Sequence, residues 1–163
     1  ATSTVRDSIR VAALRARGTP CHGLVAGEPT PGKDDYLQEL RELAQARGLA
    51  EDVSFLGHRS DMENLYAVSA VVFNLSRHAE PFGRTVIEAL AMGVPVVAYD
   101  YGGPAESLRD CLPEGLVPVG DGAALAEATL RMLEAPPQIV LPRQFTLDAQ
   151  VEATLAVYRD LLA

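Results

Sequence analysis

The sequence predicts a single α/β domain built around an open, parallel, doubly wound sheet. Helical and strand patterns alternate along the 163 residues. Strand candidates such as 70–75 are nearly unbroken apolar runs, which is typical of parallel strands covered on both faces. Hydrophobic residues make up 48% of the chain, enough for one full core. We therefore expect residues 1–163 to form one domain.

The first half of the chain is expected to hold three helices and three strands. Amphipathic helices are predicted over 5–17 and 33–47, and each is followed by a glycine that can end it, Gly18 and Gly48. The segment between 28 and 32 is rich in proline and glycine and is predicted to be a loop. Asp61 is expected to cap a short helix ending near Val68. The strands are predicted at 23–27, 53–56 and 70–75.

The second half continues the alternation. A helix over 84–92 precedes a strand at 95–99, and a Gly-Gly-Pro turn at 102–104 leads to a helix from Ala105. A short strand near 115–119 and a helix over 123–134 follow, and two prolines end that helix. The last helix, 147–162, has apolar residues at helical spacing. Ligands of such sheets bind at the carboxyl ends of the strands, which here carry residues 28, 57–59, 76–83 and 101–103.

Composition excludes several functional classes. The net charge of −8 argues against broad nucleic-acid binding, which requires clustered cations. The sequence lacks an apolar run of the roughly 18 residues that a membrane span needs, and its Ala-Thr-Ser-Thr start does not resemble a signal peptide. We expect an excised or processed piece of a protein. Cys21 and Cys111 lack metal-ligand spacing, so we expect two reduced cysteines and a cytoplasmic location.

The most informative segment runs from Glu80 to Glu88. Glu80 is expected in a loop at a strand end, and Glu88 about one turn inside the next helix. Carboxylates accept hydrogen bonds from vicinal hydroxyls, so one can hold a ribose diol and the other a sugar hydroxyl. Between them, Gly83 allows a phosphate to approach the amides of Arg84 and Thr85 at a helix N-terminus. The alternative to a binding site is that Glu80 and Glu88 are solvated surface acids and that Gly83 only forms a tight turn.

The surroundings of this segment make it specific. Seven residues separate the two glutamates, Pro-Phe-Gly follows the first, and Ala-Leu-Ala-Met-Gly-Val-Pro-Val-Val-Ala follows the second. Gly-Gly-Pro-Ala-Glu comes later, at 102–106. With these motifs, the chain resembles the C-terminal domain of the retaining glycosyltransferases of family 4, over nearly its whole length. The resemblance implies a Rossmann-like domain, half of a two-domain GT-B fold.

The resemblance also implies roles for individual residues. Glu80 would lie against the donor sugar as the catalytic residue, and Glu88 would bind the ribose hydroxyls. The diphosphate would be held by Gly83, Arg84 and Thr85. The other expected donor-binding residues are Gly57, His58 and Arg59 near the base, together with Ser76 and Phe82. The family implies no metal requirement and no cofactor other than the nucleotide diphosphate sugar substrate.

The resemblance implies three partners: a nucleotide sugar donor, an acceptor (sugar, lipid or small molecule), and an N-terminal GT-B domain absent from this chain. The upstream arginine and lysine that neutralise the donor diphosphate in the family are absent too. The isolated domain is therefore expected to be inactive. A peripheral position at the inner membrane face is an alternative to a freely cytoplasmic one.

Other interpretations stay open or are disfavoured. The family commonly has Pro-Ser at the end of the strand before the motif, whereas this chain has Asn74-Leu75-Ser76. That triplet is also a glycosylation sequon, which a buried strand disfavours. A non-catalytic nucleotide-binding or interaction module is the main alternative function. A dinucleotide dehydrogenase is disfavoured, because no Gly-x-Gly-x-x-Gly follows the first strand.

Overall fold

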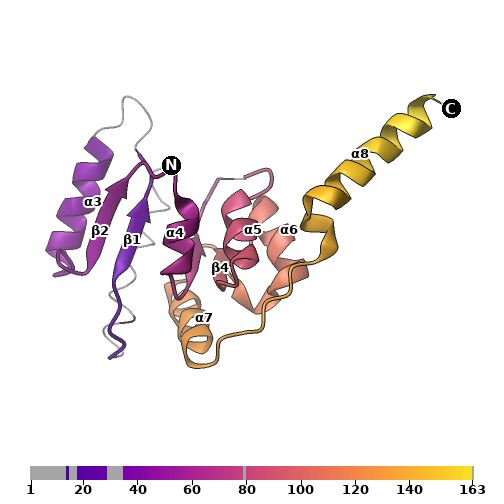
Figure 1. Cartoon of the computed structure of the whole chain (residues 1–163). Coiled ribbons are helices and arrows are strands. Elements are labelled where there is room, and N and C mark those ends of the chain that lie inside the picture. The colour runs from indigo at the N-terminus through magenta and orange to yellow at the C-terminus, as the bar shows by residue number, and fades with distance from the viewer. Residues whose placement is uncertain (1–13, 15–17, 29–34, 79, 163) are drawn as a thin grey trace.

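The computed structural model describes residues 14, 18–28, 35–78 and 80–162. The helix expected over 5–17 lies outside these residues except for Leu14, which is helical and buried, and most of the loop expected at 28–32 lies outside them too. Along the described chain, helices and parallel strands alternate, as Figure 1 shows. The α/β class predicted from the sequence is confirmed.

Among the residues that the structure describes, the N-terminal part contains a parallel strand pair and a helix that connects them. Strand β1 (Gly23–Ala26) pairs with β2 (Val53–Gly57), and helix α3 (Asp35–Ala46) connects them. The pairing runs from Gly23 opposite Val53 to Ala26 opposite Gly57, with a register shift after Val25. Leu40 and Ala44 of α3 are buried with Val53 and Leu49, so the apolar face of the helix covers this small sheet.

The larger part is a three-stranded parallel sheet in the order β3-β4-β5. These strands are β3 (Val72–Asn74), β4 (Val96–Tyr99) and β5 (Leu116–Val117). Every residue of the central strand β4 is buried, as expected for a strand covered on both faces. Its helices are α4 (Met62–Ala67), α5 (Arg84–Ala91), α6 (Gly102–Cys111) and α7 (Gly122–Glu134). A short 3-10 turn (Pro113–Gly115) precedes β5.

The strand hydrogen bonds differ from the single open sheet that the sequence predicts. Among the described residues they form two separate sheets, β1-β2 and β3-β4-β5. Each sheet has its own cluster of buried apolar side chains, one around α3 and one around β4. Because each strand group packs against its own helices, the domain has two neighbouring cores, and the predicted site residues 76–88 lie on the larger one, whereas 57–59 follow β2 of the smaller one.

Helix α6 begins earlier than predicted. The sequence placed a turn at 102–104 and a helix from Ala105, but the helix starts at Gly102 and includes Pro104 in its first turn. Proline is tolerated there because the first amides of a helix have no intrahelical acceptor. The first turn of α6 is therefore built from Gly102, Gly103 and Pro104, three residues that allow close packing from outside.

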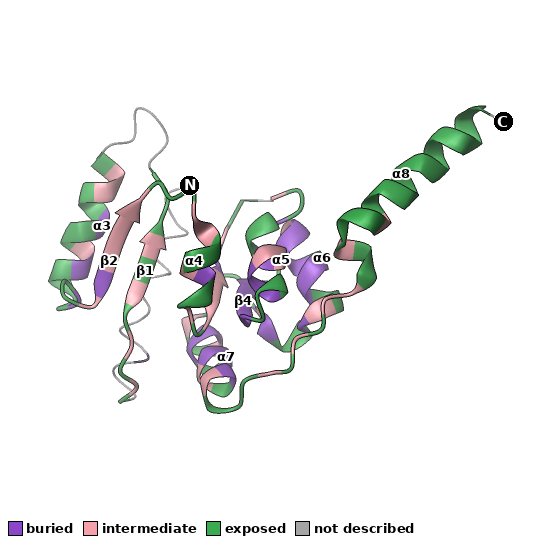
Figure 2. Ribbon diagram, in the orientation of Figure 1, coloured by how far each residue is buried: buried purple, intermediate pink, exposed green. Residues whose placement is uncertain are grey.

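The chain ends in a helix that stands apart from both cores. After a 3-10 turn (Arg143–Phe145), α8 (Leu147–Leu162) extends away from the rest of the domain (Figure 1). None of its described residues is buried (Figure 2), although several of them are large and apolar. The predicted helix is confirmed, and its apolar side chains, which include Val151, Leu155, Tyr158 and Leu162, are exposed.

Candidate functional site

The candidate site is built on the loop that joins β3 to α5. Strand β3 ends at Asn74, and α5 begins at Arg84 with Gly83 as its N-cap. Gly83 has a φ of 76°, in the left-handed region that glycine adopts without strain. The chain reverses at this residue, so that the first amides of α5 lie at the carboxyl end of β3. The strand-to-helix turn predicted from the sequence is confirmed.

The same loop packs against the first turn of α6. The backbone amide of Gly103 donates a 2.9 Å hydrogen bond to the carbonyl oxygen of Glu80. A Cβ on Gly103 would lie 2.5 Å from the carbonyl oxygen of Pro81, so only glycine fits without displacing the backbone. The hydroxyl of Ser107 also donates to the carbonyl of Phe82 at 3.4 Å. The N-termini of α5 and α6 therefore meet at one loop, and both present partial positive charge there.

Asn74 connects the two sides of this loop. Its side chain, 9% exposed, donates at 3.4 Å to Oε2 of Glu80 and at 3.1 Å to the hydroxyl of Thr85. The backbone amide of Ser76 in turn donates to Oδ1 of Asn74 at 3.4 Å. A buried amide with several partners has little freedom to rotate. Asn74 thus ties the Glu80 carboxylate to the first turn of α5.

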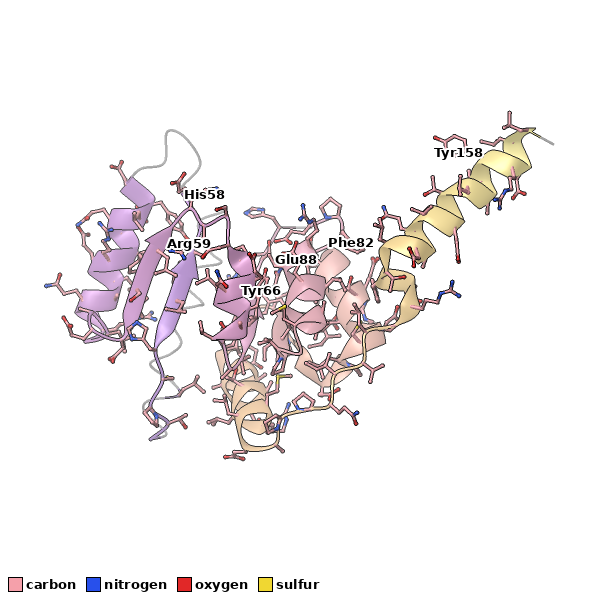
Figure 3. All side chains as sticks on the ribbon, in the orientation of Figure 1. His58, Arg59, Tyr66, Phe82, Glu88 and Tyr158 are labelled. Carbon is pink, nitrogen blue, oxygen red and sulfur yellow. The ribbon has the colours of Figure 1, made fainter. Side chains whose placement is uncertain are left out.

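The carboxylate of Glu88 is held from two sides. The hydroxyl of Tyr66 on α4 donates to Oε2 at 3.0 Å, and the guanidinium of Arg84 donates to Oε1 at 3.0 Å. Figure 3 shows Tyr66 and Glu88 beside each other, on neighbouring helices. Burial, followed by the hydrogen bond to Glu88, raises the pKa of Tyr66 to about 12. Tyr66 therefore remains a protonated donor at neutral pH.

Ser76 and Phe82 lie in the same loop but differ in exposure. The hydroxyl of Ser76 donates to the carbonyl of His78 at 2.9 Å, which closes a local turn after β3. Phe82 is 49% exposed, and its ring lies 6.4 Å from the ring of Phe145 with a tilt of 52°. An aromatic side chain this exposed is available to a ligand at the loop surface.

Gly57, His58 and Arg59 lie at the end of β2, in the other sheet. Gly57 has a φ of 66° and accepts a 2.8 Å hydrogen bond from the amide of Gly27. Arg59 forms two hydrogen bonds with the carboxylate of Asp61, at 2.8 and 2.6 Å. These bonds, and then one from Asn64, lower the pKa of Asp61 to about 2. Figure 3 shows His58 and Arg59 on the β2 side, before α4.

The structure thus connects some predicted residues more closely than others. Hydrogen bonds join Glu80 and Thr85 through Asn74, and Glu88 and Arg84 directly. The described hydrogen bonds of Arg59 lead to Asp61 instead. The part of the chain that the structure describes contains no group of three His, Cys, Asp or Glu side chains able to hold a metal ion.

Sequence reasoning missed Asn74 and Tyr66 as parts of the site. Asn74 departs from the family pattern and forms part of a sequon, yet a single amide inside an apolar strand is itself a signal, because a buried polar group needs partners. Tyr66 gave no comparable signal. Its partner Glu88 is 22 residues away, on another helix.

Comparison with known proteins identifies the family. Residues 8–135 match the family described as "Glycosyl transferases group 1". The chain belongs to the group 1 glycosyltransferases. It is similar to their C-terminal domain, which is half of a GT-B fold. The C-terminal domain of the group 1 protein LpcC from Francisella tularensis superposes with a TM-score of 0.65 at 21% identity, over 82% of this chain and 71% of that one.

Two longer proteins are also similar to this group 1 domain. The lipopolysaccharide core biosynthesis mannosyltransferase LpsB of Rhizobium meliloti is 28% identical over 158 residues, which is 88% of this chain and 45% of LpsB. Anabaena HepE, crystallised with UDP, is 31% identical with a TM-score of 0.68, over 77% of this chain and 35% of HepE. HepE has also been crystallised with UDP-glucose. The chain spans less than half the length of both proteins.

Two remaining sequence expectations concern the membrane and the cysteines. None of the described helices combines the length and apolar character that crossing a membrane demands. Cys21 and Cys111 are not joined by a disulfide, and both are partly buried.

Proposed function

We propose that this chain is the donor-binding domain of a retaining glycosyltransferase, which transfers a sugar from a nucleotide diphosphate sugar to a hydroxyl acceptor. The observation that carries the proposal is the arrangement around the N-terminus of α5. The Glu80 carboxylate is tied to its first turn through Asn74, and the Glu88 carboxylate is held one turn further on. Such an end binds anions through amides that lack intrahelical acceptors.

Each group then has a role suited to its chemistry. The amides of Gly83, Arg84 and Thr85 would bind the donor diphosphate and stabilise the charge that develops as it leaves. Glu88 would accept hydrogen bonds from the ribose hydroxyls, and Glu80 would contact the transferred sugar. The crystals of HepE with UDP and UDP-glucose support this class of donor.

The outer residues would complete the donor site. Ser76 shapes the turn after β3, and Phe82 offers an exposed ring beside the loop. Gly57, His58 and Arg59 would lie near the base, at the carboxyl end of β2. This placement is supported by the rule that ligands of parallel sheets bind beyond the strand ends.

The acceptor side and further positive charge would come from a second domain of the whole protein. The relatives are more than twice as long as this chain, which leaves room for such a domain. The exposed apolar side chains of α8 also suit a contact with another part of a larger protein. We further propose a cytoplasmic location, in line with the resemblance to the group 1 glycosyltransferases.

Calorimetric titration of the chain with UDP, GDP and ADP tests the donor-binding function. We expect one of them to bind with micromolar affinity and Glu88→Ala to weaken that binding about tenfold or more. Glu127→Ala is the matched control, because Glu127 forms a similar i,i+4 pair with Arg131 on α7, away from the loop. Absence of binding across all three nucleotides would contradict the proposal and favour a non-catalytic interaction module.

A further inference from the structure

We propose that Tyr66 is a positioning residue, which fixes the Glu88 carboxylate in the orientation that receives the ribose hydroxyls. This inference rests on the proposed function, since it concerns the residue assigned to the ribose. The observation behind it is the 3.0 Å hydrogen bond from the Tyr66 hydroxyl to Oε2 of Glu88. This bond crosses from α4 to α5, so it ties the site to the core through a second helix.

The two partners of Glu88 differ in how firmly they are held. Tyr66 is 4% exposed, and its ring packs in the larger apolar cluster with Leu90 and Val94. Arg84 has a side chain that is 83% exposed and lies on the same helix as Glu88. An exposed arginine can leave its partner at little cost, whereas a buried tyrosine cannot move without disturbing the core. Tyr66 is therefore the fixed support and Arg84 the exchangeable one.

The hydrogen-bonding capacity of the carboxylate leaves room for a ligand. Each carboxylate oxygen can accept about two hydrogen bonds, so Tyr66 occupies one of roughly four positions. If Arg84 turns toward a bound diphosphate, Oε1 becomes fully available and Oε2 keeps one free lone pair. A ribose diol needs two acceptors in a fixed geometry, which this arrangement supplies. The Tyr66 hydroxyl donates its proton to Oε2, so it uses one acceptor position of Glu88 and leaves the others to a ligand.

Removal of the hydroxyl should therefore affect ribose recognition more than folding. In Tyr66→Phe the ring still fills its place in the core, but Glu88 can adopt other rotamers that binding must then restrict. Ordering one flexible side chain weakens binding roughly two- to tenfold. The affinity should decrease for ligands whose ribose hydroxyls contact Glu88 and should hardly change for ligands without these hydroxyls.

The experiment compares each ribonucleoside diphosphate with its 2′-deoxy form in calorimetric titrations of the whole chain. The readout is the Kd of the 2′-deoxy form divided by the Kd of the ribonucleotide. A general loss of stability would leave this ratio unchanged. We expect the ratio to stay at the wild-type level in Tyr158→Phe, the control on distant α8 (Figure 3), and to fall toward one in Tyr66→Phe and in Glu88→Ala. Circular dichroism checks that each variant is folded.

The outcomes separate this inference from the proposed function. If Glu88→Ala lowers the ratio and Tyr66→Phe leaves it at the wild-type value, Tyr66 does not position Glu88, while the ribose assignment stands. If Glu88→Ala also leaves the ratio unchanged, or if the wild-type chain binds no nucleotide, the ribose assignment fails and the role of Tyr66 fails with it.

Discussion

Gly83 faces Pro104 so closely that a Cβ on the glycine would lie 2.6 Å from Cγ of the proline. This contact joins the N-cap of α5 to the first turn of α6. Together with the hydrogen bond from Gly103 to Glu80, it fixes the loop on which the candidate site is built. The two helices can begin this close together because residues 83 and 103 are both glycines, which have no Cβ.

Gly83→Ala should destabilise the domain more than Gly93→Ala. Both glycines have a left-handed backbone, with φ values of 76° and 75°, so alanine at either position costs about 1–2 kcal/mol in strain. Only Gly83 also lacks room for a Cβ, and such overpacking adds about 1–3 kcal/mol. Urea unfolding of both variants measures the difference. Equal losses of unfolding free energy in the two variants would mean that Pro104 of α6 leaves room for a Cβ at position 83.

Asn74→Asp should destabilise the domain in a pH-dependent way. At neutral pH the new carboxylate would lie beside that of Glu80 and repel it, and the loss should exceed the roughly 1–3 kcal/mol expected for Asn74→Ala. Near pH 4 carboxylates begin to take up protons, so the excess should shrink. Asn64→Asp is the matched control, because Asn64 donates to Asp61 on the exposed surface, where repulsion is screened.

Equal unfolding free energies of Asn74→Asp and Asn74→Ala at both pH values would contradict the bridging role of Asn74. Urea unfolding of both variants at neutral pH and near pH 4 supplies the four unfolding free energies that this comparison needs.

Tyr66 should make the domain less stable at high pH. Its pKa is raised to about 12 in the folded protein, first by burial and then by Glu88, against 10.0 for an ordinary tyrosine. Above pH 10 the unfolded chain releases a proton that the folded chain retains, so stability falls as the pH rises from about 10 to about 12. Below pH 10 this contribution is constant.

Urea unfolding of the wild type and of Tyr66→Phe on both sides of pH 10 measures this effect. The variant should lose less stability with rising pH, since the other tyrosines are common to both proteins. Parallel pH profiles would show that the Tyr66 hydroxyl is not held by the core and Glu88.

Polar substitution on α8 should leave the stability of the chain nearly unchanged. Leu155 is 44% exposed, so Leu155→Gln is expected to cost less than about 0.5 kcal/mol. Leu108→Ala, in the larger core, should cost about 2–5 kcal/mol. Urea unfolding compares the two. A similar loss in both variants would mean that α8 packs against the domain in solution.

Local patterns made much of this fold predictable. The nearly continuous apolar run 70–75 indicated a parallel strand, and the structure has β3 within it, with Val72 and Phe73 partly buried and Asn74 buried. A glycine before Arg84 indicated a tight entry into α5. Both features depend on residues close together in the sequence, where backbone preference and periodicity act directly. The same holds for the position of Glu80 in the loop and of Glu88 one turn inside the helix.

Long-range relationships were not predictable in this way. The partners of Asn74 and Tyr66 follow from how β3, α4 and α5 pack together, and no spacing in the sequence encodes them. The division into two sheets depends on which strands pair, again a tertiary property. For α8, periodicity predicted an apolar face but could not say whether this chain covers it. The early start of α6 reflects Pro104, which suits a first turn as well as a preceding loop.

The proposed donor site requires that a nucleoside diphosphate binds at the N-terminus of α5. Amide chemical shifts of the nitrogen-15-labelled chain, recorded during titration with UDP, GDP or ADP, test it most directly. We expect the largest changes at Gly83, Arg84 and Thr85, with smaller ones around Glu88 and Gly103. Changes confined to other surfaces, such as α7 or α8, or no changes with any of the three nucleotides, would contradict it.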